Sequence, residues 1–347
     1  MSASIRDVAE LAGVSPRTVS NVVNDFVHVR PSTRTRVLDA IEQLNYRPNI
    51  SARRLRQGRT RILGFAVPEL SQPYFAELSE QVELAAQQRG YTVITTQTGG
   101  AKQSEQRMLR DFTSHIVDGL IFSPLSLIKE ELYATPPNVP TVLIGEQISG
   151  SRFSDIAIDN VRATGDITRH LLERGHTRIA TLGAYHSDLY RSARLRLRGY
   201  REALEAAGVP FDPDLVLYTD RFGRQAGRDG TARALAEGTR FDALVCFTDM
   251  LAFGAMRALA DAGLRVPDDV AIASIDDVQE SEFSVPSLTS IAPDKQAIAT
   301  RAVDTLLELI GDRDRETAHV DIDYRLIARE SSGPPRSAAS SARDRAE

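Results

Sequence analysis

The sequence is poor in the residues and segments that mark several classes of protein. Its single cysteine, Cys246, excludes an internal disulfide and fits a reducing compartment. No apolar stretch approaches the roughly 20 residues of a membrane-spanning helix, and the N-terminus shows no apolar signal-peptide core. We therefore expect a cytoplasmic protein with no membrane partner. Because Cys246 lies in the apolar run 243–247, we expect a buried strand residue rather than a reactive thiol.

Motifs of catalysis and cofactor binding are also missing from the sequence. It contains no CxxC, GxSxG, P-loop or HExxH motif, and its histidines lack the spacing of a catalytic triad or a metal site. After the first expected strand, Pro68-Glu69-Leu70 stand where a dinucleotide-binding fold has a glycine-rich turn. We therefore expect no enzyme, no metal and no cofactor.

Charge is distributed unevenly along the chain. Residues 1–60 contain ten arginines and five acidic residues, a net of +5, whereas the whole chain carries −5, which leaves −10 for the remainder. A basic segment on an acidic body concentrates the attraction for phosphate groups in one place.

The first 24 residues have the pattern of two short helices joined by a tight turn. Gly13 stands where a helix commonly ends in a left-handed residue. Ser15 is a good N-cap for the next helix, and Pro16 is a good first helical residue. Apolar residues recur at helical spacing on both sides of this turn: Val8, Leu11, Ala12, Val19, Val22 and Val23. A third helix, capped by Ser32 or Thr33, is expected to bury Val37, Leu38, Ile41 and Leu44.

This pattern predicts an all-α helix-turn-helix DNA-binding domain over residues 1–48, whose second helix enters the major groove. Pro16, Arg17 and, one turn later, Asn21 would reach base edges, because arginine can fork onto guanine and asparagine onto adenine. Short polar side chains expected at the phosphates are Thr18, Ser20, Asn24 and His28. A generic three-helix bundle is the alternative, but the cap, the turn glycine, the proline and the polar outer face together favour DNA binding.

The string DVAELAGVSPRTVSNVVN at residues 7–24, followed by NYRPN and ARRL, resembles the lactose-repressor (LacI/GalR) family of transcriptional regulators. The resemblance continues nearly to residue 330. It implies that residues 49–60 form a hinge helix, begun by Asn49, that pairs with its twin in a homodimer. Leu55 would then wedge into the minor groove and Ala52 would allow close helix packing. A solvated basic linker is the alternative for this segment.

From residue 61 the chain alternates apolar runs with amphipathic segments. Runs typical of buried strands cover residues 62–67, 91–97, 120–122, 142–144, 156–158, 179–182, 215–218, 243–247 and 270–275. Such alternation predicts an α/β fold of doubly wound parallel sheets. The resemblance implies a two-lobed, periplasmic-binding-protein-like (type I) core over 61–330. We expect lobe 1 to span 61–161 and 292–319, and lobe 2 to span 162–291 and 320–330. The polar tail, 331–347, should be disordered.

Open parallel sheets bind ligands beyond the carboxyl ends of their strands, so candidate ligand contacts follow strands in the sequence. They are Tyr74, Phe75, Asp159, Arg196, Phe222, Thr248 and Asp276. The resemblance implies that Arg196 and Asp276 are the principal effector contacts and that Phe222 stacks on the ligand. Carboxylates, arginine and aromatic faces suit a polyhydroxylated, sugar-like effector. Thr248 and Ser274 depart from the asparagine and glycine common in the family, and Asp249 is expected to cap its helix.

Together these features predict a repressor that binds double-stranded operator DNA as a homodimer. One head reads only a half-site, and twofold symmetry matches a pseudo-palindromic operator. A small effector in the cleft between the lobes would control DNA affinity, and the residues leave open whether it releases or recruits the dimer. A sugar-binding protein or a carbohydrate-metabolising enzyme of the same fold is the alternative.

Overall fold

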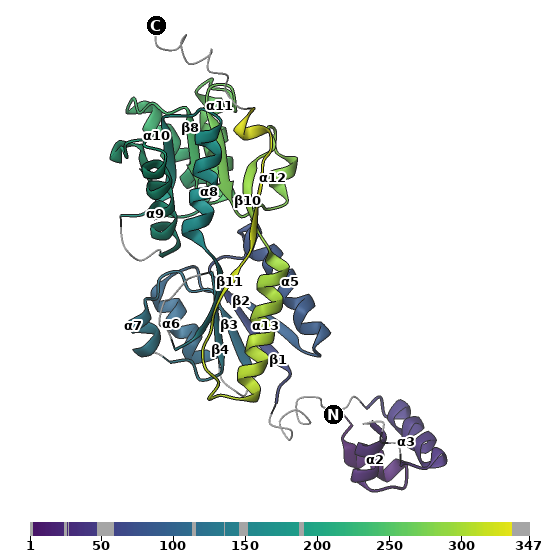
Figure 1. Cartoon of the computed structure of the whole chain (residues 1–347). Coiled ribbons are helices and arrows are strands. Elements are labelled where there is room, and N and C mark those ends of the chain that lie inside the picture. Colours follow the sequence, from purple (N-terminus) through teal and green to yellow (C-terminus); the bar gives the residue numbers. More distant parts are fainter. Residues whose placement is uncertain are drawn as a thin grey trace, which may run out of the picture. The chain divides into compact units, whose positions relative to one another are not determined.

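The structure is a computed structural model that describes residues 3–23, 26, 28–46, 59–112, 116–134, 136–145, 152–186 and 191–334. The chain divides into two compact units, Met1–Thr60 and Arg61–Glu347, which we call the head and the core. The described residues of the head form three helices, and the core contains two α/β lobes, each built around its own sheet (Figure 1).

The described helices of the head are α1 (Ile5–Leu11), α2 (Pro16–Val23) and α3 (Pro31–Gln43). Its small core is formed by residues that are at most 5% exposed: Val8, Ala9, Ala12, Val19, Val22, Val37 and Ala40. The three helices predicted over residues 1–48 are therefore confirmed. Leu11 and Leu38 were expected inside and are each 50% exposed, because alanines 9 and 40 take the inward positions.

Local hydrogen bonds explain where the head helices begin and end. Gly13 has φ of +62°, the left-handed conformation expected after α1. The Thr18 amide donates to Ser15 Oγ at 3.2 Å, as expected of a capping serine. The predicted cap of α3 by Ser32 or Thr33 is wrong, because α3 already begins at Pro31, whose fixed φ suits a first helical residue.

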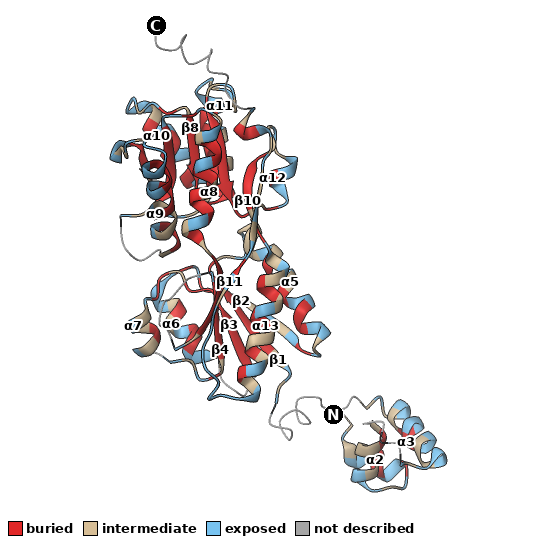
Figure 2. Cartoon of the chain, viewed as in Figure 1, coloured by how far each residue is buried: buried red, intermediate tan, exposed pale blue. Residues whose placement is uncertain are grey.

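The sheet of lobe 1 is parallel throughout, in the order β11-β5-β4-β3-β1-β2. Its strands are β1 (Ile62–Val67), β2 (Thr92–Gln97), β3 (Gly119–Phe122), β4 (Thr141–Ile144), β5 (Ser154–Ile158) and β11 (His319–Ile322). Its central strands are wholly buried (Figure 2). Helices α5 (Pro73–Gln88) and α13 (Lys295–Gly311) cover one face, and α6 (Lys102–Asp111) and α7 (Lys129–Ala134) cover the other.

The sheet of lobe 2 has the corresponding order β12-β10-β9-β8-β6-β7. Its strands are β6 (Ile179–Ala184), β7 (Val216–Tyr218), β8 (Ala243–Cys246), β9 (Ala271–Ile275), β10 (Thr289–Pro293) and β12 (Tyr324–Ile327). Helices α8 (Asn160–Glu173) and α9 (Arg191–Ala206) cover one face, and α10 (Arg224–Ala236) and α11 (Asp249–Asp261) cover the other. The short helix α12 (Glu280–Phe283) follows β9. The predicted fold class is confirmed, with one difference, since β12 runs antiparallel to β10.

The chain passes between the lobes after β5, after β10 and after β11. The third passage differs from the expected switch at residue 319, because residues 319–322 form β11 of lobe 1 and lobe 2 resumes at β12. The strand is short and half polar, so its sequence carries no clear strand pattern.

The chain remains packed in lobe 2 after β12 ends. Ser331 and Ser332 are fully buried, and Ser331 Oγ donates to the Ile272 carbonyl at 2.7 Å. The packed core therefore extends past the predicted limit at residue 330, whereas residues 335–347 lie outside the described part of the chain.

Within the described part of the chain, no helix combines the length and the apolar character needed to cross a membrane.

Candidate nucleic-acid interface and ligand pocket

The predicted DNA contacts lie on the outer face of α2. Pro16 and Arg17 are exposed at its first turn, and Ser20 and Asn21 are half-buried one turn later. Val19 and Val22 fasten the opposite face of α2 to the head core. The helix therefore presents Arg17 and Asn21 on the side that faces away from the bundle. The Thr18 hydroxyl lies 2.9 Å from Ser15 Oγ, so it also takes part in the cap.

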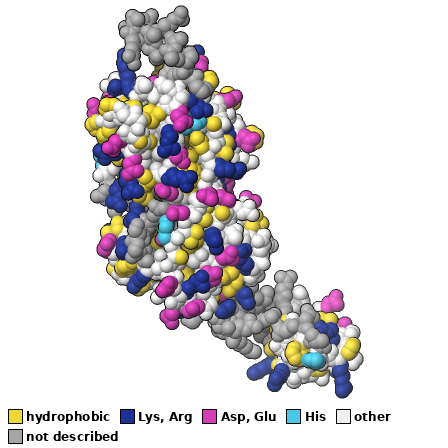
Figure 3. Space-filling model, in the orientation of Figure 1, with side chains coloured by type: hydrophobic (Ala, Val, Ile, Leu, Met, Phe, Trp, Pro, Cys, Tyr) yellow, Lys and Arg dark blue, Asp and Glu magenta, His cyan; other side chains and the backbone are white. Residues whose placement is uncertain are grey.

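Two aromatic rings of the segment between α2 and α3 contact each other, and an arginine of α3 binds the same segment. His28 is exposed, and its ring meets Phe26 edge-on at 5.6 Å between centroids. Arg34 Nη2 donates to the Phe26 carbonyl at 3.0 Å. Lys and Arg side chains project from the head in Figure 3, in keeping with its net positive charge. The predicted contacts at Asn24, Asn49, Ala52 and Leu55 lie outside the described residues.

A pocket of about 460 Å³ lies between the two lobes of the core, at the carboxyl ends of their strands. Six of the seven predicted ligand contacts line it: Tyr74, Phe75, Arg196, Phe222, Thr248 and Asp276. The seventh, Asp159, is not among the described lining residues. Its carboxylate instead caps α8 by accepting from the amides of Val161 and Arg162, each at 3.0 Å. A polar residue between a strand and a helix suits a cap as well as a ligand contact, and the ligand contact of Asp159 stays a prediction.

The wall formed by lobe 1 is mainly apolar. The first turn of α5 brings Tyr74 and Phe75 to the pocket, with their rings edge-to-face at 5.3 Å. Apolar side chains from strand ends and from two helices complete the wall: Leu78, Ile144, Ile156, Ile158 and Ile298. Burial raises the pKa of the Tyr74 hydroxyl, and nearby Asp276 raises it further, so this hydroxyl stays protonated. Gln72 Nε2 donates to the Phe222 carbonyl of lobe 2 at 2.5 Å, which joins the walls at one side.

The wall formed by lobe 2 is mainly polar. Arg196 donates through Nε to Asn160 Oδ1 at 2.8 Å and through Nη1 to the Phe247 carbonyl. These bonds hold the guanidinium in one orientation at the pocket. Phe222 packs edge-on against Tyr185, with 5.2 Å between the ring centroids. Asn160, Tyr185 and the buried Ser192 also line the pocket.

Asp276 is the acidic centre of this wall. It is only 7% exposed, and burial raises the pKa of its carboxyl to about 8. Nearby Arg196 and Lys295 lower this pKa only in part, while Asp249 raises it further. Near neutral pH the carboxyl therefore keeps its proton, and it can donate one hydrogen bond to a ligand hydroxyl as well as accept others.

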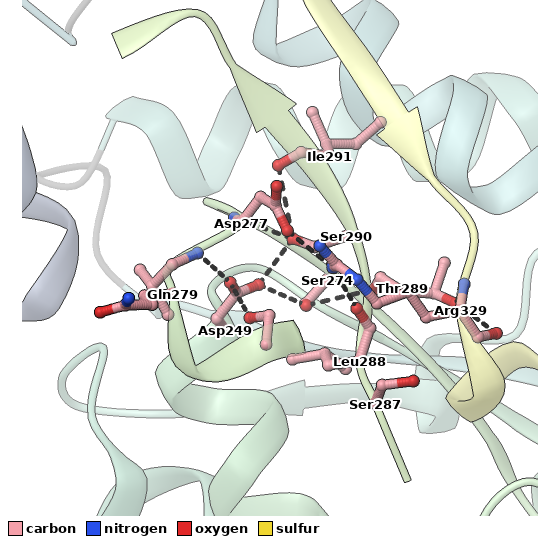
Figure 4. A network of polar contacts seen from close by, with 12 residues as sticks. Asp249, Ser274, Asp277, Gln279, Ser287, Leu288, Thr289, Ser290, Ile291 and Arg329 are labelled. Atoms are coloured by element: carbon pink, nitrogen blue, oxygen red, sulfur yellow. Dashed lines mark hydrogen bonds and ion pairs between the residues drawn. The ribbon is translucent and has the colours of Figure 1, made fainter. Parts of the chain in front are cut away.

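Asp249 supports the turn after β9 that carries Asp276, and Figure 4 shows Asp249 beside Ser274 and Ser290. The carboxylate is fully buried and accepts from the hydroxyls of Ser274 at 2.5 Å, Ser281 at 2.6 Å and Ser290 at 2.7 Å. It also accepts from the Val278 amide at 2.9 Å. Ser274, which departs from the common family residue, thus binds Asp249 in the interior. The expected helix cap at Asp249 is wrong, because Thr248 caps α11 through the Leu251 amide.

Lobe 1 has a counterpart of Asp249 that sequence reasoning missed. Glu105 on α6 is fully buried and accepts from the amides of Leu125 at 2.7 Å, Ser126 at 3.2 Å and Leu127 at 3.0 Å. Burial raises the pKa of Glu105, and these three bonds oppose the shift. The loop that it holds brings Leu125 to the pocket. A lone glutamate in a polar helix gives no sequence signal of such a role.

No described group of His, Cys, Asp and Glu residues has the arrangement of a metal site. Cys246 is buried in β8, as expected, and burial raises the pKa of its thiol well above the ordinary value.

Comparison with known proteins relates both units to one group of regulators. Residues 4–49 match "Bacterial regulatory proteins, lacI family", and residues 168–332 match "Periplasmic binding protein-like domain". The HTH-type transcriptional repressor PurR of Aliivibrio fischeri is 34% identical over 333 residues, which are 95% of this chain and 98% of the relative.

Two solved structures extend the likeness to the fold. The lac repressor dimer bound to operator and the anti-inducer ONPF is 28% identical with a TM-score of 0.85, over 96% of this chain and 100% of that chain. The complex of the transcriptional regulator CelR with cellobiose is 30% identical with a TM-score of 0.70, over 95% of this chain and 99% of that chain.

Proposed function

Because the chain belongs to the LacI family of bacterial transcriptional regulators, whose members are regulators and not enzymes, we propose that it represses genes by binding a pseudo-palindromic operator as a homodimer. A small effector in the pocket between the lobes controls that binding. We further propose that the effector is a sugar or a sugar derivative.

The arrangement of α2 supports the DNA part of this proposal. Arg17 is exposed at the helix start, where a recognition helix meets base edges, and Asn21 follows one turn later. A relative of matching fold is described as a dimer bound to operator. The hinge roles of Asn49, Ala52 and Leu55 remain proposals by resemblance.

The two unlike walls of the pocket are the observation that carries the ligand assignment. Asp276 and Arg196 offer a donor and acceptor pair to vicinal hydroxyls, while Tyr74 and Phe75 offer ring surfaces to the apolar side of a sugar. A volume of about 460 Å³ is within the usual range for small-molecule sites. CelR, which shares the fold, is described in complex with cellobiose.

Operator capture with competition tests this function. The purified full-length protein is incubated with a genomic DNA library, and each enriched site is challenged with sugars and nucleobases. A palindromic site that one sugar releases would support an inducible repressor, and a site bound only with a compound would support a corepressor system. Absence of an enriched site would overturn the DNA-binding assignment, and response to nucleobases alone would overturn the sugar assignment.

Arg17→Ala tests base reading within the captured site. We expect specific binding to weaken by about 1–3 kcal/mol, with nearly unchanged binding to random DNA, because a lost base contact affects only the cognate site. Arg36→Ala, an exposed arginine of α3, is the control for loss of charge alone. An equal loss on both DNAs in Arg17→Ala would contradict base reading.

A further inference from the structure

The turn after β9, residues 276–279, carries Asp276 and is held firmly by lobe 2. Asp276 and Asp277 have φ of 130° and 44°, conformations that cost free energy in residues other than glycine. Such conformations persist only where surrounding bonds hold them. The Asp277 amide donates to Ser290 Oγ at 3.0 Å, and its carboxylate pairs with Arg329 at 2.7 Å, as Figure 4 shows.

The same turn is also bonded to lobe 1. The Gln279 amide donates to Glu77 Oε1 at 2.8 Å, and the Asp277 carbonyl accepts from Lys295 Nζ at 2.8 Å. Lys295 Nζ in turn lies 2.6 Å from Glu77 Oε2. Glu77 belongs to α5, and Lys295 is the first residue of α13, so both anchors lie on the helices that cover one face of the lobe 1 sheet.

These contacts are shielded and charge-assisted. The Lys295 side chain is 14% exposed and the Glu77 side chain 29%, so salt and water screen the pair less than a surface ion pair. Both partners bind backbone atoms of the turn in addition to each other, which distinguishes them from a simple ion pair. Glu77 and Lys295 therefore fix the position of the turn relative to lobe 1, whereas a simple ion pair would only keep two side chains close together.

Helix α5 also forms part of the pocket. Its first turn carries Tyr74 and Phe75, one turn before Glu77. A movement of lobe 1 relative to lobe 2 must therefore either break the bonds at Gln279 and Asp277 or carry the turn, and Asp276 with it.

We propose that Glu77 and Lys295 are positioning residues that couple the placement of Asp276 to the relative arrangement of the two lobes. The effect of a ligand on this coupling rests on the proposed function. The bonds from Glu77 and Lys295 to the turn belong to the core and do not depend on a ligand. Because coupling between two states is reciprocal, a ligand that moves Asp276 shifts the lobes, and an arrangement of the lobes that DNA favours changes ligand affinity by the same factor.

Distance measurement between the lobes tests the link without ligand or DNA. Spin labels on cysteines that replace Arg107 on α6 and Glu205 on α9, both exposed, report the interlobe distance in the full chain by double electron–electron resonance. We expect Glu77→Ala and Lys295→Met each to broaden or shift the distance distribution. Lys102→Met and Glu131→Gln are the matched controls, because this Lys–Glu pair joins α6 to α7 within lobe 1.

Amide hydrogen exchange of the turn supplies the second readout. In Glu77→Ala the Gln279 amide should exchange about tenfold faster, the factor expected from loss of one charge-assisted bond. The control variants should leave it unchanged. The proposal would be overturned if the interlobe distances and the amide exchange were both unchanged in Glu77→Ala and Lys295→Met. A lower melting temperature in these variants would not rescue it, because the pair would then only stabilise the fold. Operator capture uses neither the interlobe distance nor the amide exchange. A failure of the proposed function can therefore be told apart from a failure of this coupling.

Discussion

Each lobe of the core contains a wholly buried carboxylate that holds a loop beside the pocket, and the two loops present different chemistry. In lobe 1, Glu105 accepts three backbone amides, and its loop brings Leu125 to the pocket. In lobe 2, Asp249 accepts three serine hydroxyls and one amide, and its turn brings Asp276 to the pocket. The same device thus supports an apolar wall on one side and an acidic group on the other.

The two lobes share a fold but differ in the residues that they bring to the pocket. Both sheets have the same strand order, with β6 to β10 in the places of β1 to β5. Their shared topology puts the pocket at the carboxyl ends of the strands in each lobe. The residues after those strands then decide what each wall can bind, so a duplicated fold yields a pocket with two unlike faces.

Removing the buried acid of lobe 2 should have the largest effect. Asp249→Ala should lower the free energy of unfolding by about 3–5 kcal/mol, because three hydroxyls and one amide lose their acceptor in the interior. Urea unfolding measures this change. Glu105→Ala is the matched variant in lobe 1, with a comparable loss of stability and a smaller loss of effector affinity. Equal losses of effector affinity in both variants would remove the distinction between the lobes.

Replacing the acidic group of the polar wall by an amide should abolish the effector response. Asp276→Asn should weaken effector binding by about 1–3 kcal/mol, the cost of leaving a buried hydrogen-bonding group of the ligand unsatisfied, while operator binding without effector persists. Titration calorimetry with the compound found by operator capture measures this affinity. Asp268→Asn, an exposed aspartate of lobe 2 outside the described pocket lining, is the control. A normal response in Asp276→Asn would place the effector elsewhere.

The raised pKa of Asp276 predicts a pH dependence of stability. The native carboxyl keeps its proton up to about pH 8, whereas the unfolded one loses it near its ordinary pKa, about 3.9. The native state therefore binds more protons between pH 4 and 8, so the contribution of Asp276 to stability falls as pH rises through that window. The fall is at most about 1.4 kcal/mol per pH unit.

Comparison of melting curves at pH 5 and pH 8 isolates this effect. Asp276→Asn cannot titrate, so its stability relative to the parent protein should rise toward pH 8. A difference between the two proteins that stays constant with pH would mean that Asp276 is ionised throughout.

Changing the apolar wall should have the smallest effect. Phe75→Ala should weaken effector binding by about 1–2 kcal/mol, through lost apolar contact, and should do so similarly for ligands that differ only in their hydroxyls. Phe153→Ala, a half-buried residue of lobe 1 outside the described pocket lining, is the control. Loss of discrimination between stereoisomeric sugars in Phe75→Ala would assign specificity to lobe 1 instead.

The site was only partly readable from the sequence. Arg196 and Asp276 were found because they follow strands and match a family pattern, and both line the pocket. Asp159 has the same signal but caps a helix. Glu105 was missed because it stands in a polar helix and nothing in the sequence near it shows that it is buried beside the pocket.

Local sequence determined the helices of the head, the central strands of both sheets and the α/β class, because caps, turns and apolar periodicity act over a few residues. Tertiary structure alone decided which polar residues meet. Lys295 reaches Glu77 across 218 residues of sequence, and Asp249 reaches Ser290 across 41. Such pairs form because the chain passes three times between two sheets, and their energies depend on burial, which only the assembled lobes create.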